Sequence, residues 1–472
     1  MTIASRAYAA FVLAFALLAF GLVLFVPAVL RDGDTFLHIA AGNWMLDHHA
    51  LLRADPFSFT MRGKPWVSHE WLAELLMALA YRIGGWPGLL LPFATTLALA
   101  VILLGAAMRR WMAPLPAAVL LFAAMYTQVP TLLARPHLLV LPILIAWCDA
   151  MLRARGQKRA PHPALALLMV LWVNLHGSFF VGLAFAGAMA GEAWLSEAGR
   201  RAQVARAWGV FLLAALAGAL ATPHGIQGLL LPFHLLRMPA LSAISEWQPT
   251  NFATFQPMTP LLLGLLYIGL VYAPRLPRLR VALLLALVYT ALQHGRNQVL
   301  LGMVGLQVIA EPLGRYFHAD VPGPAGAALR PSRPAWGAAL AGALMLFAVR
   351  IALPVTIGDD ITRPVSALAH VPPALAAQPV LNSYSFGSYL IFRGISPFID
   401  SRAELYGNDF LQAYLDMAKP DHVKLEQVLA SYHIAWTLSD THSAIAEMLD
   451  LLPGWKRLYA DDTAVIHVRA AP

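Results

Sequence analysis

The chain has 472 residues, of which 59% are hydrophobic and only 12% are charged, and its mean hydropathy is +0.64. A soluble globular domain carries about a quarter charged residues, so this composition excludes a soluble enzyme and is typical of a helical bundle in lipid. The net charge of +8 does not indicate nucleic acid, because the Lys and Arg residues stand in short clusters between apolar runs, the pattern that sets membrane topology. The single cysteine, Cys148, cannot form an intrachain disulfide.

A first membrane helix is predicted near the N-terminus. Arg6 precedes an apolar run over 8–30 that is longer than the hydrophobic region of a signal peptide and has no clear cleavage site. At about 1.5 Å per residue, such a run spans a hydrocarbon core of about 30 Å. We therefore expect a retained helix, and similar segments predict about eleven spanning helices in all. The segments lie near 8–30, 88–108, 114–133, 137–152, 163–175, 178–196, 207–221, 258–273, 279–293, 297–313 and 335–354.

The charges between these segments predict the orientation of the bundle. With Arg6 inside, every dense basic cluster falls on the inner side, as the positive-inside rule expects. The segment 71–84 is apolar but short and contains Glu74 and Arg82, so we interpret it as an amphipathic helix at the outer interface. If it crossed the membrane, the cluster at 153–159 would move outside. The inner clusters are Arg109 and Arg110; Arg153, Arg155, Lys158 and Arg159; Arg200, Arg201 and Arg206; and Arg275, Arg278 and Arg280.

The composition changes near residue 356, where polar residues reach an ordinary frequency. The stretches VLNSY, SYLIF, HIAWTL and AVIHV have the pattern of strands, and 425–431 and 444–452 have the pattern of helices. We therefore predict an α-helical polytopic membrane domain over 1–355, with a first outer loop at 31–87. A small α/β domain over 356–472 is expected outside the cytoplasm. The predicted location is the bacterial cytoplasmic (inner) membrane, crossed many times.

Ionisable residues gather at the predicted outer turns. Such groups at the ends of membrane helices are expensive unless they are hydrated, paired or functional. Each also has a plain reading, because acids can be solvated, an Arg stem can snorkel and a His beside Gly can cap a helix. A cation at a helix start is disfavoured by the helix dipole, so Arg296 indicates an anionic partner. The candidates are Asp32, Asp34, His38, Asp55, His69, Glu70, Arg135, His137, His176, His224, Glu246, Arg296, Asp400 and Arg402.

Acids together with Arg and His at an outer membrane face suit the transfer of a group from a lipid-linked donor. Such a donor presents a phosphate or pyrophosphate leaving group at that surface. Arg side chains neutralise phosphate charge in a site of low dielectric, and a carboxylate can deprotonate or orient an acceptor hydroxyl. A divalent ion, Mg²⁺ or Mn²⁺, would assist the leaving group, and Asp34 with His38 permits such a site without proving it.

The organisation resembles the GT-C superfamily of glycosyltransferases that use polyprenyl-phosphate-linked sugars, which includes protein O-mannosyltransferases, oligosaccharyltransferases and the aminoarabinose transferases of lipid A. The stretch RDGDTFLH places acids directly after the first helix, where that superfamily keeps its catalytic acid. The long first outer loop with its interfacial helix and the C-terminal outer domain are similar too. ADPFSFTMRGKPWVSHEWLAELL also resembles predicted bacterial proteins of this broad type.

The resemblance implies roles for these residues. Asp32 or Asp34 would be the base or the metal-bound acid, and Asp55, His69 and Glu70 would be further catalytic candidates. The donor phosphate would be held by Arg135, His137, His176 and Arg296, and the acceptor or accessory group comprises His38, His224, Glu246, Asp400 and Arg402.

The implied partners are a lipid-linked sugar donor, membrane lipids and an acceptor that is a cell-envelope glycan, lipid or protein. The tail has no WWDYG-like acceptor signature, and its nearest stretch is FIDSRAELYG, which argues against N-glycosylation of a sequon. Three alternatives stay open. An O-antigen-ligase-like transferase would favour a large outer loop late in the bundle. A transporter or flippase of lipid-linked glycans would place polar residues at the helix midplanes. A non-catalytic assembly subunit would have retained the GT-C scaffold without its activity.

Overall fold

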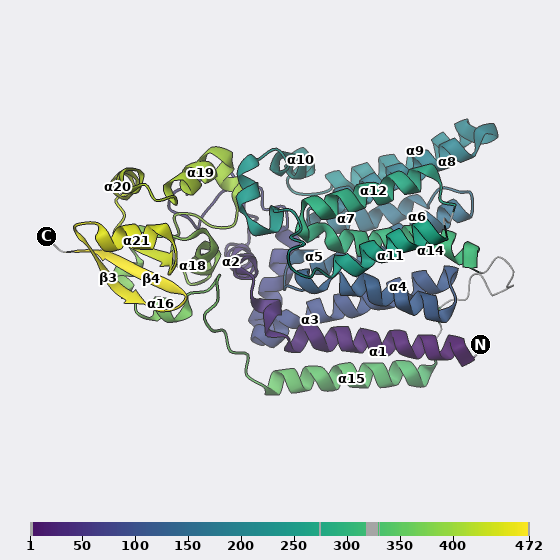
Figure 1. Ribbon diagram of the computed structural model, residues 1–472, viewed down its shortest axis with the longest axis horizontal. Helices are drawn as coiled ribbons and strands as arrows, with labels where there is room; N and C mark the ends of the chain where they lie inside the picture. Colours follow the sequence, from purple (N-terminus) through teal and green to yellow (C-terminus); the bar gives the residue numbers. More distant parts are fainter. Residues whose placement is uncertain (1–2, 273–274, 318–328, 330, 471–472) are drawn as a thin grey trace.

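The computed structural model describes residues 3–272, 275–317, 329 and 331–470. Its helices form a bundle whose long members run side by side along the longest dimension of the molecule, and a smaller domain with a sheet caps one end (Figure 1). The helices of the bundle are α1 (Ile3–Phe25), α2 (Gly33–His48), α3 (Trp71–Trp111), α4 (Pro114–Tyr126), α5 (Pro136–Leu139), α6 (Leu141–Gly156), α7 (Leu167–Leu175), α8 (Phe179–Ser196), α9 (Arg201–Leu220), α10 (Gly225–Leu235), α11 (Met258–Val271), α12 (Arg278–Gln293), α13 (Gln298–Leu300), α14 (Leu306–Phe317) and α15 (Arg333–Ala352).

All of the predicted spanning segments are helical over most of their length, although the last residue of the segment 258–273 lies outside the described residues. Two segments end earlier than predicted. α1 stops at Phe25 because Pro27 follows, and α4 stops at Tyr126 rather than reaching 133. By length and composition, five helices of the described chain qualify as membrane spans: 4–25, 71–111, 179–196, 198–220 and 333–352.

The segment predicted to lie at the interface is the first part of α3, separated from the rest by a sharp kink. Gly84 and Gly85 leave helical geometry, and Gly85 has φ +57° and ψ −145°, a conformation open mainly to glycine. The first part packs tightly on α2, since a Cβ on Gly42 would lie 2.0 Å from the carbonyl oxygen of Glu74. Residues 71–83 therefore form a helix distinct from the apolar part that follows, and the predicted position of the segment 71–84 at the membrane interface stays a prediction.

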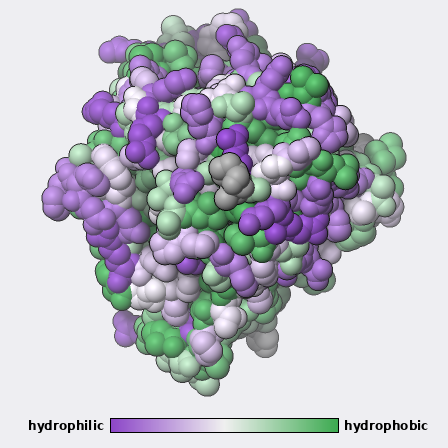
Figure 2. All heavy atoms as spheres, turned by 90° about the vertical axis from the view of Figure 1, so that its left-hand side faces the viewer, coloured by the Kyte–Doolittle hydropathy of each residue, from purple (hydrophilic) through white to green (hydrophobic). Residues whose placement is uncertain are grey.

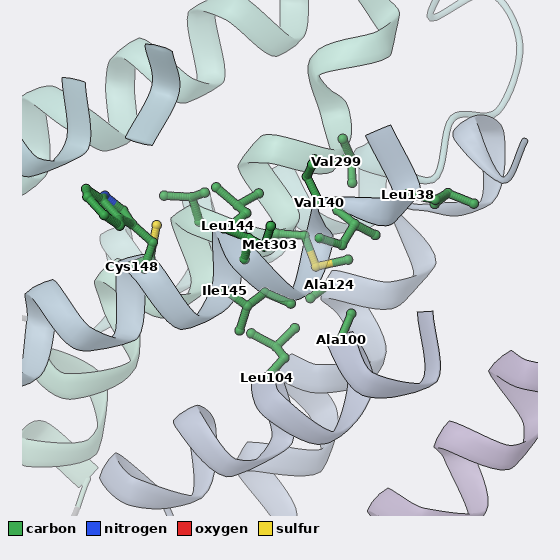
Figure 3. Close-up of a cluster of buried hydrophobic side chains, with 14 of the residues drawn as sticks. Ala100, Leu104, Ala124, Leu138, Val140, Leu144, Ile145, Cys148, Val299 and Met303 are labelled. Atoms are coloured by element: carbon green, nitrogen blue, oxygen red, sulfur yellow. The ribbon is translucent and has the colours of Figure 1, made fainter. Parts of the chain in front are cut away.

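The centre of the bundle is an apolar core. Figure 3 shows Leu104, Val140, Leu144 and Met303 converging there with Cys148 nearby, and all of them are buried. The outer faces of the helices are also apolar. On α15, Leu340, Leu344, Met345 and Ile351 are each at least 60% exposed, and such a surface is expected to face lipid.

The predicted inner basic clusters lie at the end of the bundle away from the sheet domain. There they form buried ion pairs between helices: Arg280 binds Glu192 at 2.9 Å and Glu311 at 2.9 Å, and Arg155 binds Glu192 at 3.3 Å. α1 begins at this end and α15 leads back to the sheet domain (Figure 1). The bundle thus has one end rich in Arg and another that carries the predicted site, and which of the two ends faces the cytoplasm stays a prediction.

The C-terminal domain combines a four-stranded sheet with short helices. The strand order is β1-β2-β4-β3, with β1 parallel to β2 and the other pairs antiparallel. Hydrophilic side chains cover much of the end of the molecule formed by this domain (Figure 2), as expected for a surface in water. Its elements are β1 (Val380–Asn382), β2 (Trp436–Asp440), β3 (Trp455–Ala460), β4 (Ala464–Arg469), α16 (Val365–Ala369), α17 (Pro373–Ala376), α18 (Gly387–Phe392), α19 (Ala403–Met417), α20 (His422–Ser431) and α21 (Ala444–Leu451).

One predicted strand is wrong. SYLIF forms α18, because a helix lets Tyr389 and Phe392, three positions apart, meet the same aromatic ring of α2. Their ring centroids lie 5.0 and 5.3 Å from that of Phe36. The other three predicted strands and both predicted helices are confirmed, whereas α19 and β3 were not predicted. α18 therefore belongs to the contact between the two domains.

Candidate active site

Three carboxylates surround the guanidinium of Arg135 at the end of the bundle next to the sheet domain. Its Nη1 lies 3.0 Å from Asp32 Oδ2, and its Nη2 lies 2.6 Å from Asp34 Oδ2. Nη1 also contacts Glu246 Oε1. We call these four residues, together with Arg296, the arginine–carboxylate cluster. Their side chains are 10–40% exposed, so a ligand from outside can reach them.

Local structure brings this cluster together. Asp32 is the N-cap of α2, and its Oδ1 accepts a hydrogen bond from the backbone N–H of Asp34 at 2.8 Å. Ala134, the residue before Arg135, makes two hydrogen bonds to the chain on either side of Asp32. The Ala134 N–H donates to the Val29 carbonyl at 2.8 Å, and the Ala134 carbonyl accepts from Thr35 Oγ1 at 3.0 Å. The two outer turns are therefore held side by side by the backbone.

Arg296 lies farther from the carboxylates of the cluster than Arg135 does. Its Nη1 lies 4.0 Å from Glu246 Oε2, beyond hydrogen-bond distance, and its guanidinium lies over the Trp247 ring at 4.2 Å. His294 holds that Trp in place, since its Nδ1 is 2.8 Å from the Trp247 carbonyl oxygen. Contact with the ring restricts the orientation of the guanidinium.

The cluster has more negative than positive charge, and Asp32 shows the effect. Burial raises the pKa of Asp32 to about 7, with Asp34 and Glu246 raising it further and Arg135 opposing them. A carboxylate with a pKa near 7 can accept a proton at neutral pH and release it again. Asp32 is therefore better suited to proton transfer than an ordinary surface acid.

Three histidines converge on Glu70 beside this cluster. Their Nε2 atoms lie 3.5 Å (His38), 3.5 Å (His69) and 3.6 Å (His176) from its carboxylate oxygens. His38 also approaches Glu74 at 3.5 Å through Nδ1. We call this group the Glu70–histidine cluster. Glu70 and His69 precede α3, His38 lies on α2, and His176 lies in the turn between α7 and α8.

The histidines differ in protonation. Burial opposes a charge on His69, but Glu70 outweighs it and raises the pKa of His69 to about 9. Burial would also raise the pKa of Glu70, yet His176 and His69 hold it below its ordinary value. Burial, aided by Arg296, lowers the pKa of His176 to about 4. At neutral pH, Glu70 and His69 therefore form an ion pair beside a neutral His176.

Hydrogen bonds select the tautomers of the two neutral rings. The Ser178 N–H donates to His176 Nδ1 at 3.1 Å, so the proton of that ring is on Nε2. For His137, burial and Arg135 lower the pKa to about 3, and its Nε2 lies 2.7 Å from the Thr131 carbonyl oxygen, to which it donates. His137 thus presents Nδ1 as an acceptor, which suits a hydroxyl better than the phosphate for which it was predicted.

The two clusters are adjacent. The rings of His137 and His176 are 6.2 Å apart, and after burial the charge of Arg135 is the largest cause of the lowered pKa of His137. Burial opposes the charge on Arg135, but Asp32, Asp34 and Glu246, and to a smaller extent Glu70, raise its pKa. The structure thus brings ten of the predicted residues to one end of the bundle: Asp32, Asp34, His38, His69, Glu70, Arg135, His137, His176, Glu246 and Arg296.

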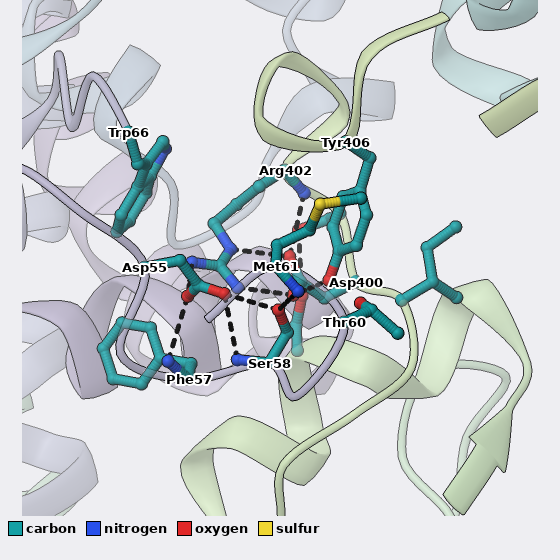
Figure 4. A network of polar contacts seen from close by, with 12 residues as sticks. Asp55, Phe57, Ser58, Thr60, Met61, Trp66, Asp400, Arg402 and Tyr406 are labelled. Atoms are coloured by element: carbon teal, nitrogen blue, oxygen red, sulfur yellow. Dashed lines mark hydrogen bonds and ion pairs between the residues drawn. The ribbon is translucent and has the colours of Figure 1, made fainter. Parts of the chain in front are cut away.

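Asp55, Asp400 and Arg402 form a separate buried network between the first loop and the C-terminal domain (Figure 4). Arg402 donates to Asp55 Oδ1 at 2.6 Å and to both oxygens of Asp400 at 2.7 and 2.6 Å. Its guanidinium stacks on Trp66 at 4.6 Å, and Tyr406 donates to Asp400 at 2.7 Å. Both carboxylates are bound by the one guanidinium of Arg402, so this network joins the two domains. A catalytic role for Asp55 stays a prediction.

His224 lies at the edge of the site. Its Nε2 is 3.1 Å from the carbonyl oxygen of Ser68, which holds the turn just before His69 and Glu70. Sequence reasoning missed Glu404, whose Oε1 accepts from Trp66 Nε1 at 3.0 Å, and Tyr384, whose raised pKa arises from burial and from Asp34. Both come from the C-terminal domain; Glu404 lies within FIDSRAELYG, two residues after Arg402, whereas no motif was identified around Tyr384.

The predicted metal ligands face different partners. Asp34 points to Arg135, and His38 lies between Glu70 and Glu74. Within the described part of the chain, no group of three or more His, Cys, Asp or Glu side chains has an arrangement that could hold a metal ion. Asp34 and His38 therefore do not fit a shared metal site.

No protein-family model and no curated protein matches the sequence, but several solved structures match the fold. Archaeoglobus fulgidus AglB, an archaeal oligosaccharyltransferase solved with an inhibitory peptide and a dolichol-phosphate, aligns with a TM-score of 0.58 at 11% identity, over 93% of this chain and 70% of its own. The apo form of the oligosaccharyltransferase from that organism gives 0.53 at 13% identity, over 91% and 69%. ArnT from Cupriavidus metallidurans bound to undecaprenyl phosphate gives 0.50 at 14% identity, over 98% of both chains. The chain is therefore a helical membrane protein with the GT-C fold and a small C-terminal α/β domain.

Proposed function

We propose that this protein is a glycosyltransferase that moves a sugar from a polyprenyl-phosphate-linked donor to an acceptor. The proposal rests on the arginine–carboxylate cluster, which lies at the start of α2 in a chain with the GT-C fold. The side chains of this cluster are partly exposed, so a ligand can reach them. Two of the similar structures hold dolichol-phosphate or undecaprenyl phosphate. A lipid phosphate needs a cation near the membrane surface, and Arg296 of this cluster supplies one.

The donor phosphate is assigned to Arg296. Its guanidinium is stacked on Trp247 and has no carboxylate partner closer than 4.0 Å among the described residues. A planar guanidinium with free N–H groups binds two phosphate oxygens at once. His176 is neutral, but its Nε2 faces Glu70 at 3.6 Å, so it is not assigned to the phosphate.

Asp32 is assigned as the base. An acceptor hydroxyl or amine attacks the anomeric carbon, its bond to that carbon forms, and the bond from the carbon to the phosphate oxygen breaks. The polyprenyl phosphate leaves with the bonding electron pair, and the proton of the acceptor passes to Asp32. Because the pKa of Asp32 is raised to about 7, chiefly by burial, the carboxylate can take that proton and return it to water.

Transport is the less favoured alternative. A transport pathway needs polar side chains at the midplane of the bundle. Here Leu104, Leu144, Ile145 and Met303 fill the middle (Figure 3). A non-catalytic subunit would have no need for an acid with a perturbed pKa beside an accessible Arg.

The site is placed on the face of a bacterial cytoplasmic membrane that looks away from the cytoplasm, together with the C-terminal domain. This orientation rests on the basic clusters at the opposite end. The acceptor is a cell-envelope glycan, lipid or protein that reaches this surface, and the C-terminal domain borders the site through Glu404 and Tyr384.

The proposal is tested in cells that lack the gene and are complemented with wild-type protein, Asp34→Asn or Asp47→Asn. Asp47 is a matched control because it lies on α2 but pairs with Arg82 on the surface at 2.6 Å. Wild type and Asp47→Asn should restore the surface glycan profile. Asp34→Asn removes the carboxylate that holds Arg135 Nη2 at 2.6 Å beside the base Asp32, so this variant should insert normally and let a lipid-linked sugar accumulate. Full complementation by Asp34→Asn would contradict the proposal.

A further inference from the structure

Arg135 occupies a position that carboxylates approach from three directions. Asp32 and Asp34 reach it from the start of α2, and Glu246 reaches it from the 3₁₀ turn at Ser245–Trp247. Oxygen ligands gathered in this way are the usual surroundings of a hard divalent cation. In this chain the centre of the arrangement is the guanidinium itself.

We infer that Arg135 is the resident cation of the site and takes the place that a divalent metal ion would fill. Only the catalytic role of Arg135 rests on the proposed function. Whether the site binds a metal ion can be measured without any reaction. It revises the sequence prediction, in which Arg135 bound the donor phosphate and a metal stood near Asp34. Arg135 is a positioning residue that orients the carboxylates, and the phosphate is left to Arg296.

The contacts support this assignment. Nη1 and Nη2 are both engaged by carboxylate oxygens, so the charge of Arg135 is already compensated inside the cluster. The backbone on either side is fixed as well: the Ala134 N–H donates to Val29, and Pro136 starts α5. A side chain held at both its backbone and its head group cannot move aside easily for a metal ion.

Electrostatics lead to the same conclusion. Three carboxylates face Arg135 and the more distant Arg296, which leaves one excess negative charge when Asp32 is ionised and none when it is protonated. A divalent ion added beside Arg135 would meet a cation at contact distance, and like charges at short range repel strongly in a site of low dielectric. The two Arg residues therefore compensate all but one of the carboxylate charges without a metal.

The test is whether removing Arg135 creates a metal site. The full-length protein in detergent is titrated with Mn²⁺, and the free ion is followed by electron paramagnetic resonance. Arg135→Ala leaves three carboxylates around a vacated space and should bind one Mn²⁺ ion per chain with millimolar affinity or better, with a rise in its melting temperature. Wild type should show neither effect. Arg82→Ala is the matched control, since Arg82 is an exposed partner of Asp47 at the same end of the bundle.

Two further variants make the outcome decisive. Adding Asp34→Asn to Arg135→Ala should abolish Mn²⁺ binding. Should Arg135→Ala fail to fold, Arg135→Gln replaces it, because Gln keeps polar hydrogen-bonding atoms without the charge. Mn²⁺ binding by wild type that is lost in Asp34→Asn would overturn the inference, and so would a folded Arg135 variant that binds no metal. Neither result depends on a sugar donor, so a failure of the proposed transfer reaction remains distinguishable.

Discussion

Arg402 of the C-terminal domain and Asp55 of the first loop form an ion pair of 2.6 Å, and their side chains are 2% and 0% exposed. The same guanidinium binds Asp400 within its own domain. The loop that carries Asp55 continues to His69 and Glu70, so this pair connects the C-terminal domain to the Glu70–histidine cluster through the chain itself.

Arg402→Ala is expected to destabilise the protein by about 3–5 kcal/mol, because it leaves Asp55 and Asp400 buried without a cation. Thermal unfolding followed by tryptophan fluorescence measures the loss. The control is Arg457→Ala, which removes an exposed ion pair with Asp450 and should cost about 0–1 kcal/mol. Equal melting temperatures for Arg402→Ala and the control would mean that the domains are not held by this network.

The activity is expected to rise with pH through about 7. The proposed base accepts a proton only when it is ionised, and burial raises the pKa of Asp32 to about 7. The pH profile of sugar transfer in membranes should therefore have an ascending limb near that value. An ascending limb near pH 4, the range of an ordinary Asp, would exclude Asp32 as the base.

Asp32→Asn should make the protein more stable at pH 8 while it abolishes transfer. The pKa of this group is higher in the folded than in the unfolded state, so the folded chain binds the proton more tightly. Stability from this group is therefore present at low pH and is lost as pH rises from about 4 to about 7. Asn removes that loss and still caps α2. The gain in melting temperature should be absent at pH 4, which serves as the internal control.

The placement of the helices could be predicted well from sequence, because apolar runs and basic clusters report directly on membrane insertion. α2 was missed. Asp32 and Asp34 were interpreted only as candidate catalytic residues, although Asp32 is also an N-cap and so marks the start of a helix. Asp32 therefore has two roles, as the N-cap of α2 and as the candidate base. Both roles are met by an acidic side chain at the N-terminus of a helix.

The residues of the site could be predicted as a group but not in their pairings. Every outer turn carried an ionisable residue, and the fold brings most of these turns together. Which carboxylate meets which cation depends on tertiary contacts between distant segments. Asp55 and Arg402 are 347 residues apart, and nothing in FIDSRAELYG indicates that its Arg would reach the first loop.

Glu70→Gln should lower the pKa of His69 from about 9 toward its ordinary value, because Glu70 is the main cause that opposes the effect of burial. The ion pair stabilises the fold fully below the unfolded His pKa of about 6.5 and is lost as pH rises through about 9. The variant should therefore melt below wild type at pH 6.5, with the difference disappearing above pH 9. A difference that persists at pH 10 would assign the loss to packing. Asp47→Asn, which removes an exposed ion pair with Arg82 at the same end of the bundle, is the control.

Arg296→Ala should weaken the binding of undecaprenyl phosphate by about 10- to 100-fold, the typical range for losing hydrogen bonds to a charged group. The measurement is a thermal-shift titration of the detergent-solubilised protein, with undecaprenol as the ligand that lacks the phosphate. Arg296→Lys should recover only part of the affinity, because an ammonium group cannot stack on Trp247 and bind two oxygens in one plane. Arg82→Ala, at the same end of the bundle but paired with Asp47, should bind like wild type. Equal binding of the phosphate and the alcohol by wild type would remove Arg296 from the donor site, because its role depends on the charge of the phosphate.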